Sequence, residues 1–254
     1  MSTDLLTINA APAAWIDARD PRVRLLTALL FALVTVNLQG LASLLILLGM
    51  VLGLALAAGI TPSLLLKRLF VLEGFMLVLM LFLPFSVPGE TWFQLGSLHA
   101  SMEGTLRAVT IFLRAHVVVV ILLVLVGTLD AVKFGHALAQ LRLPDKLVHL
   151  LLFTVRYLGV LHEEYGRLRQ AMRTRGFKAR SDRHTWRVLG WLVGMLLVRS
   201  LERSQRIHNA MKCRGFNHRF YLIDGHPWRW GDSLFGLTSL LGLTTLLLLD
   251  RWYW

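Results

Sequence analysis

Charge is scarce in this 254-residue chain, and cysteine is nearly absent. Only 17% of the residues are charged, whereas 56% are hydrophobic; a soluble domain normally carries about 25% charged residues. The single cysteine, Cys213, excludes an intrachain disulfide and gives no sign of a segment folded in an oxidising compartment. This composition places the chain among membrane proteins.

Three common sequence patterns are also missing. The first 20 residues lack the basic-then-apolar order of a secretory signal. No glycine is followed by lysine, which excludes a Walker A phosphate loop, so we expect this chain not to bind ATP and not to be an enzyme. The nine histidines form neither His-Glu-x-x-His nor a His/Cys cluster at ligand spacing, so we expect no metal site.

Long apolar runs are present instead. A spanning helix needs about 20 mostly apolar residues, and the fold class we predict is an all-α integral membrane protein with about five transmembrane helices plus a cytoplasmic coupling region. Tryptophans flank the last run on both sides, as in the aromatic belts at membrane interfaces. The candidate runs are Val23–Leu38, Leu41–Ile60, Leu69–Val87, Ala108–Leu129 and Ser233–Leu249.

The excess positive charge lies in one block. Residues 131–231 contain 19 Lys and Arg against 6 Asp and Glu, a net charge of +13, and the rest of the chain has 8 against 9. Basic residues also precede the first span and join the second to the third, which predicts a cytoplasmic N-terminus. We therefore expect three domains: an N-terminal membrane domain of four spans (1–129), a cytoplasmic coupling-helix region (130–231) and a C-terminal transmembrane helix (232–254). A basic block also predicts an acidic partner.

Three polar residues fall inside the predicted spans. Glu73 and Arg114 lie at depths that differ by roughly half the bilayer, so we do not expect them to pair. Snorkelling toward the nearer interface is the favoured interpretation for Glu73, whereas Arg114 is equally open to a functional role. His116 is interpreted as a packed or pore-lining residue rather than a ligand.

A seven-residue motif occurs twice within the basic block. Ala-Met-Arg-Thr-Arg-Gly-Phe at 171–177 recurs 39 residues later as Ala-Met-Lys-Cys-Arg-Gly-Phe at 210–216. Each copy ends a segment of 31 residues, 145–175 and 184–214, whose first half is apolar and whose second half is basic. We predict two long helices, ended by the glycines in left-handed caps and with basic last turns that complement the helix dipole. An arginine and a phenylalanine at such a tip suit a partner's groove.

These motifs resemble the paired Ala-Arg-Gly signatures of the transmembrane (T) component of energy-coupling-factor (ECF) importers. The opening segment Ile16–Leu25 is similar to the start of that family, and Met211–Tyr221 is most similar to its cobalt-transport branch, CbiQ. Three positions depart from the pattern: Thr174 and Cys213 replace the alanine of the signature, and Asn217-His218 replaces Asp-Gly.

The resemblance implies a coupling subunit with two long, crossing helices. Its partners would be two copies of an ABC-type ATPase, a membrane-embedded substrate-binding subunit, with or without a small auxiliary membrane subunit, and the lipid bilayer. ATP and Mg²⁺ would be bound by the ATPases and Co²⁺ or Ni²⁺ by the substrate-binding subunit, so this chain would carry no cofactor. The location implied is the bacterial inner membrane, with the N-terminus and coupling region cytoplasmic. The residues implied to dock the ATPases are Arg173, Arg175, Gly176, Phe177, Lys212, Arg214, Gly215 and Phe216.

Two alternatives remain open at this point. One is the same role in an importer of nickel or of another ECF substrate. The other is a membrane-tethered binder of anionic lipid or nucleic acid, although no nucleic-acid recognition motif is present and no nucleic-acid partner is expected.

Overall fold

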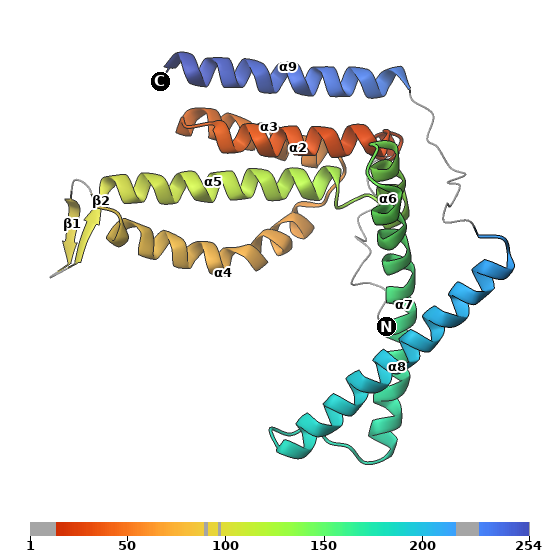
Figure 1. The fold of residues 1–254 in the computed structure, drawn as a ribbon. Coiled ribbons are helices and arrows are strands. Elements are labelled where there is room, and N and C mark those ends of the chain that lie inside the picture. Colours follow the sequence, from red (N-terminus) through yellow and green to blue (C-terminus); the bar gives the residue numbers. More distant parts are fainter. Residues whose placement is uncertain (1–13, 89–90, 96–97, 217–228, 254) are drawn as a thin grey trace. The chain divides into compact units, whose positions relative to one another are not determined.

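The structure of the protein is a computed structural model, which describes residues 14–88, 91–95, 98–216 and 229–253. The chain divides into two compact units, residues 1–130 with 226–254 and residues 131–225. Figure 1 shows the elements of both. Their positions relative to each other are not determined, so each is described by itself.

The first unit is a layer of helices with one short hairpin. Its elements are α1 (Ala14–Asp17), α2 (Pro21–Asn37), α3 (Leu41–Ala57), α4 (Pro62–Ser86), β1 (Thr91–Leu95), β2 (Leu98–Ser101), α5 (Met102–Leu125) and α9 (Trp230–Tyr253). In Figure 1, α2 and α3 lie between α9 and α5, and α4 runs along the other side of α5. Helices therefore form at all five predicted spans.

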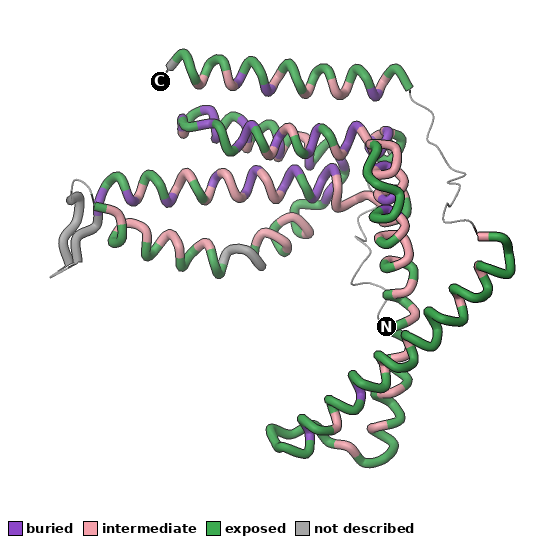
Figure 2. The backbone as a smooth tube through the Cα atoms, viewed as in Figure 1, coloured by how far each residue is buried: buried purple, intermediate pink, exposed green. Residues whose placement is uncertain are grey.

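The core of this unit lies where α2, α3 and α5 meet. Side chains such as Leu47 of α3 and Val117, Ile121 and Val124 of α5 are fully buried there. Figure 2 shows the buried residues concentrated on these helices, whereas α9 is mostly exposed. Exposed leucines along α9 are expected in a helix that faces lipid rather than water.

The helix ends follow from local sequence. Asp20 accepts a hydrogen bond from the backbone of Arg22 at 2.9 Å, and Pro21 occupies the first position of α2. The hydroxyl of Ser101 accepts from the backbone of Gly104 at 3.0 Å and so caps α5. Because of that cap, α5 begins at Met102, six residues before the predicted span.

Two helices are long and apolar enough to cross a membrane, α5 and α9, within the part of the chain that the structure describes. Helix α4 makes a third if its two segments, Pro62–Phe70 and Gly74–Ser86, which are bent by 56°, form one span. Helices α2 and α3 have 17 residues each. The predicted class of a helical membrane protein is confirmed, and the connection between α4 and α5 contains the two-stranded hairpin β1–β2.

The second unit consists of α6 (Ala131–Gln140), α7 (Asp145–Thr174) and α8 (Arg183–Cys213). Helix α6 packs against the first half of α7, where Leu152 lies so close to Gly135 that a Cβ atom there would come within 2.5 Å of its Cδ2. Helices α7 and α8 have 30 and 31 residues and cross each other (Figure 1). The long crossing helices are thus present, with bounds within one residue of those predicted.

Candidate functional site

Both long helices end in the same backbone motif. At the end of α7, the backbone N–H of Gly176 donates to the carbonyl of Arg173 at 3.0 Å, and that of Phe177 donates to Met172 at 3.1 Å. At the end of α8, Gly215 donates to Lys212 at 3.0 Å and Phe216 to Met211 at 3.1 Å. These paired bonds define a Schellman motif, with the glycine in the left-handed conformation.

The glycines carry this geometry. The φ angles of Gly176 and Gly215 are +78° and +76°, a region in which any side chain is strained. Nothing lies within 4 Å of the position that a Cβ would take at either residue. The requirement for glycine is therefore conformational and not a matter of space.

Matching side chains in the two copies of the motif also have the same exposure. Arg173 and Arg175 are exposed, whereas Met172 and Phe177 are half-buried. In the second copy, Lys212 and Arg214 are exposed, and Met211 and Phe216 are half-buried. The half-burial of both residues fits the hydrophobic contact across the last turn that often accompanies this motif. The arginines are left to face outward.

The outward-facing charge is of one sign. Neither 171–178 nor 210–216 contains an acidic residue, and Arg173, Arg175 and Lys178 are all exposed in the first copy. The last carbonyls of a helix carry a partial negative charge, which these cations complement. The guanidinium of an arginine presents a fork of N–H donors that fits a carboxylate. Each tip therefore has the chemistry to enter an acidic groove.

The two tips lie at opposite ends of α8. Helix α7 ends at Thr174 and α8 begins at Arg183, so the first tip is within eight residues of the start of α8. The second tip follows the 31 residues of α8, a length of about 46 Å at 1.5 Å per residue. The two crossing helices therefore carry two similar tips that are separated by the length of α8.

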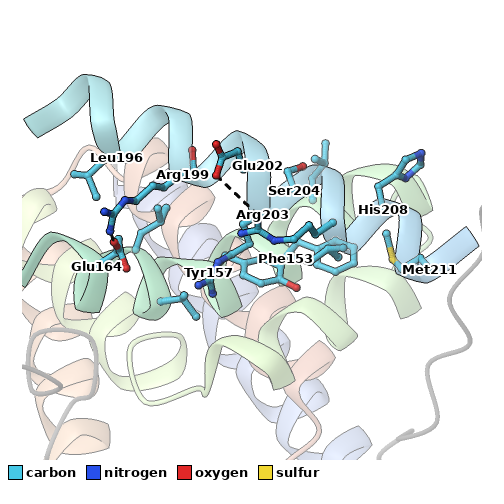
Figure 3. Close-up of a pocket in the computed structure, with 16 residues that line it drawn as sticks. Phe153, Tyr157, Glu164, Leu196, Arg199, Glu202, Arg203, Ser204, His208 and Met211 are labelled. Carbon is cyan, nitrogen blue, oxygen red and sulfur yellow. Dashed lines mark hydrogen bonds and ion pairs between the residues drawn. The ribbon is translucent and has the colours of Figure 1, made fainter. Parts of the chain in front are cut away.

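An ion pair joins the two helices near the crossing. Glu164 of α7 accepts a hydrogen bond from Arg199 of α8, and Arg167 lies 3.3 Å from the other oxygen of the same carboxylate. The hydrogen bond from Arg199 is the main reason that the pKa of Glu164 is lowered from its ordinary value. Figure 3 shows this pair at one end of a cleft between the helices.

Two carboxylates that the sequence analysis did not single out attach the two ends of α9 to the residues that flank α2. Near its start, Asp232 accepts from the backbone of Asp20 at 3.2 Å and of Arg229 at 3.1 Å. Near its end, Asp250 accepts from the backbone of Gln39 at 2.9 Å and of Gly40 at 3.0 Å. The only signal in the sequence is an acidic residue in the first and last turns of an apolar helix.

Arg24 and Arg114 also bond to backbone carbonyls. Arg24, in the first turn of α2, is buried, and its Nε donates to the carbonyl of Leu125 at 3.0 Å. Arg114 donates from Nη2 to the carbonyl of Leu38 at 2.6 Å. Both arginines tie α2 to α5 in this unit. The side chain of Glu73 lies outside the described residues.

His116 is buried, and its Nδ1 lies 2.9 Å from the carbonyl of Phe112 one turn earlier. This fits a packed residue. No group of three His, Cys, Asp or Glu side chains is placed to hold a metal ion within the residues described. Asn217, His218 and the segment that ends at Tyr221 lie outside those residues.

Comparison with known proteins gives one family. A family model described as cobalt transport protein, CbiQ, matches residues 12–222, which include both tips. The cobalt transport protein CbiQ of Rhodobacter capsulatus is 26% identical over 126 residues, 49% of this chain and 51% of that protein. The nickel permease LarQ of Lactiplantibacillus plantarum is 29% identical over 97 residues, 38% of this chain and 35% of that permease. An uncharacterized protein of Methanocaldococcus jannaschii is 23% identical over 239 residues, 91% of this chain and 82% of that protein. The chain thus matches about half or less of the two relatives named for metal transport.

Proposed function

The chain belongs to the cobalt transport protein family CbiQ, and on this premise we propose that it is the transmembrane coupling subunit of an ATP-driven ECF-type importer of a divalent metal ion. Cobalt is the first choice of ion because of the family, and nickel is the alternative because a nickel permease is among the relatives. The protein would be non-catalytic and would lie in the bacterial inner membrane, with α7 and α8 on the cytoplasmic side.

The observation that carries the proposal is the repetition of one tip at two helix ends. A single Schellman motif is a common way to end a helix. Here the cap, the exposed arginine and the half-buried phenylalanine all recur, at ends separated by the length of α8. Two like tips on one chain suit two copies of one partner, and their positive charge suits acidic grooves. We assign these partners as two ABC-type ATPase subunits.

In this proposal, Arg175 and Arg214 enter the two ATPases. Arg173 and Lys212 add charge two residues earlier, Gly176 and Gly215 shape the turns, and Phe177 and Phe216 support them. When ATP draws the ATPases together, the tips move with them, and the helices act as levers on a membrane-embedded subunit that captures the metal. ATP and Mg²⁺ belong to the ATPases and the transported ion to the capture subunit.

The experiment is a tagged purification in mild detergent from cells that express the whole transporter. The wild type is expected to retain an ATPase and a small membrane subunit, and Arg175→Glu with Arg214→Glu is expected to lose the ATPase. Reversing the charge of an arginine that meets a carboxylate replaces attraction with repulsion, so we expect a loss of at least tenfold.

The matched control is Arg169→Glu with Arg206→Glu. These exposed arginines lie on the same two helices, six and eight residues before the tip arginines, and the change in charge is identical. Loss of the ATPase from both variants alike would show a diffuse charge effect and refute the assignment of the tips. Purification of the wild type without an ATPase would refute the coupling function itself.

A further inference from the structure

The second unit contains a cleft that the docking tips do not use. It lies between α7 and α8, has a volume of about 640 Å³ and is lined by both helices (Figure 3). Pockets that hold small molecules have volumes of roughly 300–1,000 Å³. The cleft is therefore large enough for part of an amphipathic ligand.

One side of the cleft is apolar. Leu150, Phe153, Tyr157 and Leu161 of α7 line it at spacings of three and four residues, which place them on one face of the helix. The rings of Phe153 and Tyr157 are stacked, with centroids 6.0 Å apart. Leu150 and Leu161 are 63% and 39% exposed, so this face is open to an apolar occupant.

The other side carries charge that is only partly balanced. Arg199 is paired with Glu164, and Arg206 lies 3.8 Å from Glu202 one turn before it on α8. Arg203 lies between them on the same lining. It contributes to the positive field that lowers the pKa of Glu164, yet it has no ion pair among the residues that the structure describes. The lining thus has three arginines against two glutamates.

We propose that this cleft binds an anionic phospholipid, with the headgroup phosphate at Arg203 and an acyl chain along the apolar face of α7. A free phosphate would leave that face in water, and a neutral lipid would leave the charge of Arg203 unmatched. The inference rests on the proposed orientation, in which α7 and α8 meet the cytoplasmic leaflet. That leaflet is negatively charged and attracts basic segments.

The test uses the full-length chain, purified in detergent that contains either dioleoyl phosphatidylglycerol or dioleoyl phosphatidylcholine. Native mass spectrometry counts the lipids that stay bound. We expect one phosphatidylglycerol per chain and little phosphatidylcholine. Arg203→Gln should lower the retention of phosphatidylglycerol about fivefold, the value of one cationic side chain near an anionic surface.

Two further variants separate a built site from diffuse charge. Arg169→Gln removes an exposed arginine outside the cleft and should leave retention unchanged. Leu161→Gln should lower retention without a change in charge. Equal losses in Arg203→Gln and Arg169→Gln, equal retention of the two lipids, or full displacement of phosphatidylglycerol by inorganic phosphate would each overturn the proposal.

The outcome is independent of the docking experiment. Lipid retention is measured on the isolated chain, whereas ATPase retention is measured with the tip variants. If Arg203→Gln released the ATPase or the membrane subunit and left lipid retention unchanged, the cleft would hold a protein segment and the lipid site would be refuted, while the coupling function would stand.

Discussion

Glu164 and Arg199 are 35 residues apart in sequence and form a hydrogen-bonded ion pair between α7 and α8. Within α7 and α8, which the structure describes in full, the buried residues are Val148 of α7 and Thr185 and Leu192 of α8. The two helices therefore cross with little apolar burial to fix their angle. A directional bond between the long helices therefore contributes to how the two tips are held.

This pair leads to a prediction about the crossing. Glu164→Gln and Arg199→Gln should each broaden the distribution of distances between spin labels on α7 and α8, measured by pulsed electron spin resonance. The charge-swapped double variant, Glu164→Arg with Arg199→Glu, should restore part of the narrow distribution. If neither single variant changes the distribution, the pair does not control the crossing.

The crossing should also depend on pH. The pKa of Glu164 is lower in the folded protein than in the unfolded chain, mainly because Arg199 donates a hydrogen bond to its carboxylate. The contribution of the pair is therefore complete above the ordinary glutamate pKa of about 4.3, and it is lost as the pH falls through the lowered value. The label distances should be constant from pH 7 to about 5 and should broaden only in more acidic solution. The Glu164→Gln variant should lack this transition.

The glycines of the tips should not tolerate alanine. Gly176→Ala and Gly215→Ala force a side chain into the left-handed region, at a cost of about 1–2 kcal/mol. We expect the last turn of each helix to fray, with faster amide exchange there and weaker retention of the ATPase. Asparagine should be milder, since it tolerates this conformation.

Gly166 is the control for this comparison. It lies inside α7, and nothing is within 4 Å of the position that a Cβ would take. Gly166→Ala should stabilise the helix by about 0.5–1 kcal/mol. Equal effects of alanine at Gly166 and Gly176 would contradict a conformational role for the tip glycine.

The attachment of α9 gives a prediction for the first unit. Asp250 accepts hydrogen bonds from the backbone of Gln39 and Gly40, which would otherwise be unpaired at the turn before α3. Asp250→Ala should destabilise the unit by about 0.5–2 kcal/mol, the usual cost of losing a cap. Thermal unfolding in detergent and limited proteolysis near α9 are the measurements.

A matched aspartate is available at the start of α8. Asp182 is the N-cap of that helix, but its side chain makes no capping hydrogen bond. Asp182→Ala should therefore change the melting temperature much less than Asp250→Ala. The reverse order would contradict the role assigned to Asp250.

The local features of this protein follow from short stretches of its sequence. Five apolar segments are helices in the structure, and the long segments predicted to end at Arg175 and Arg214 end within one residue of those positions. The caps could be predicted because a Schellman motif is formed by hydrogen bonds within six consecutive residues, and a glycine after a basic last turn indicates such a helix end. The docking role of the tips stays a prediction.

The contacts between residues far apart in the sequence follow only from how the helices pack. Asp250 lies 210 residues from Gly40, and nothing near either residue in the sequence indicates the other. Nothing in the sequence around Arg24 indicates that it is buried, yet packing of α2 on α5 places it against the carbonyl of Leu125. Helical periodicity says which residues share a face of one helix, but the partner of that face depends on how all the helices pack together. For the same reason, the cleft beside Arg203 exists only because α7 and α8 cross where they do.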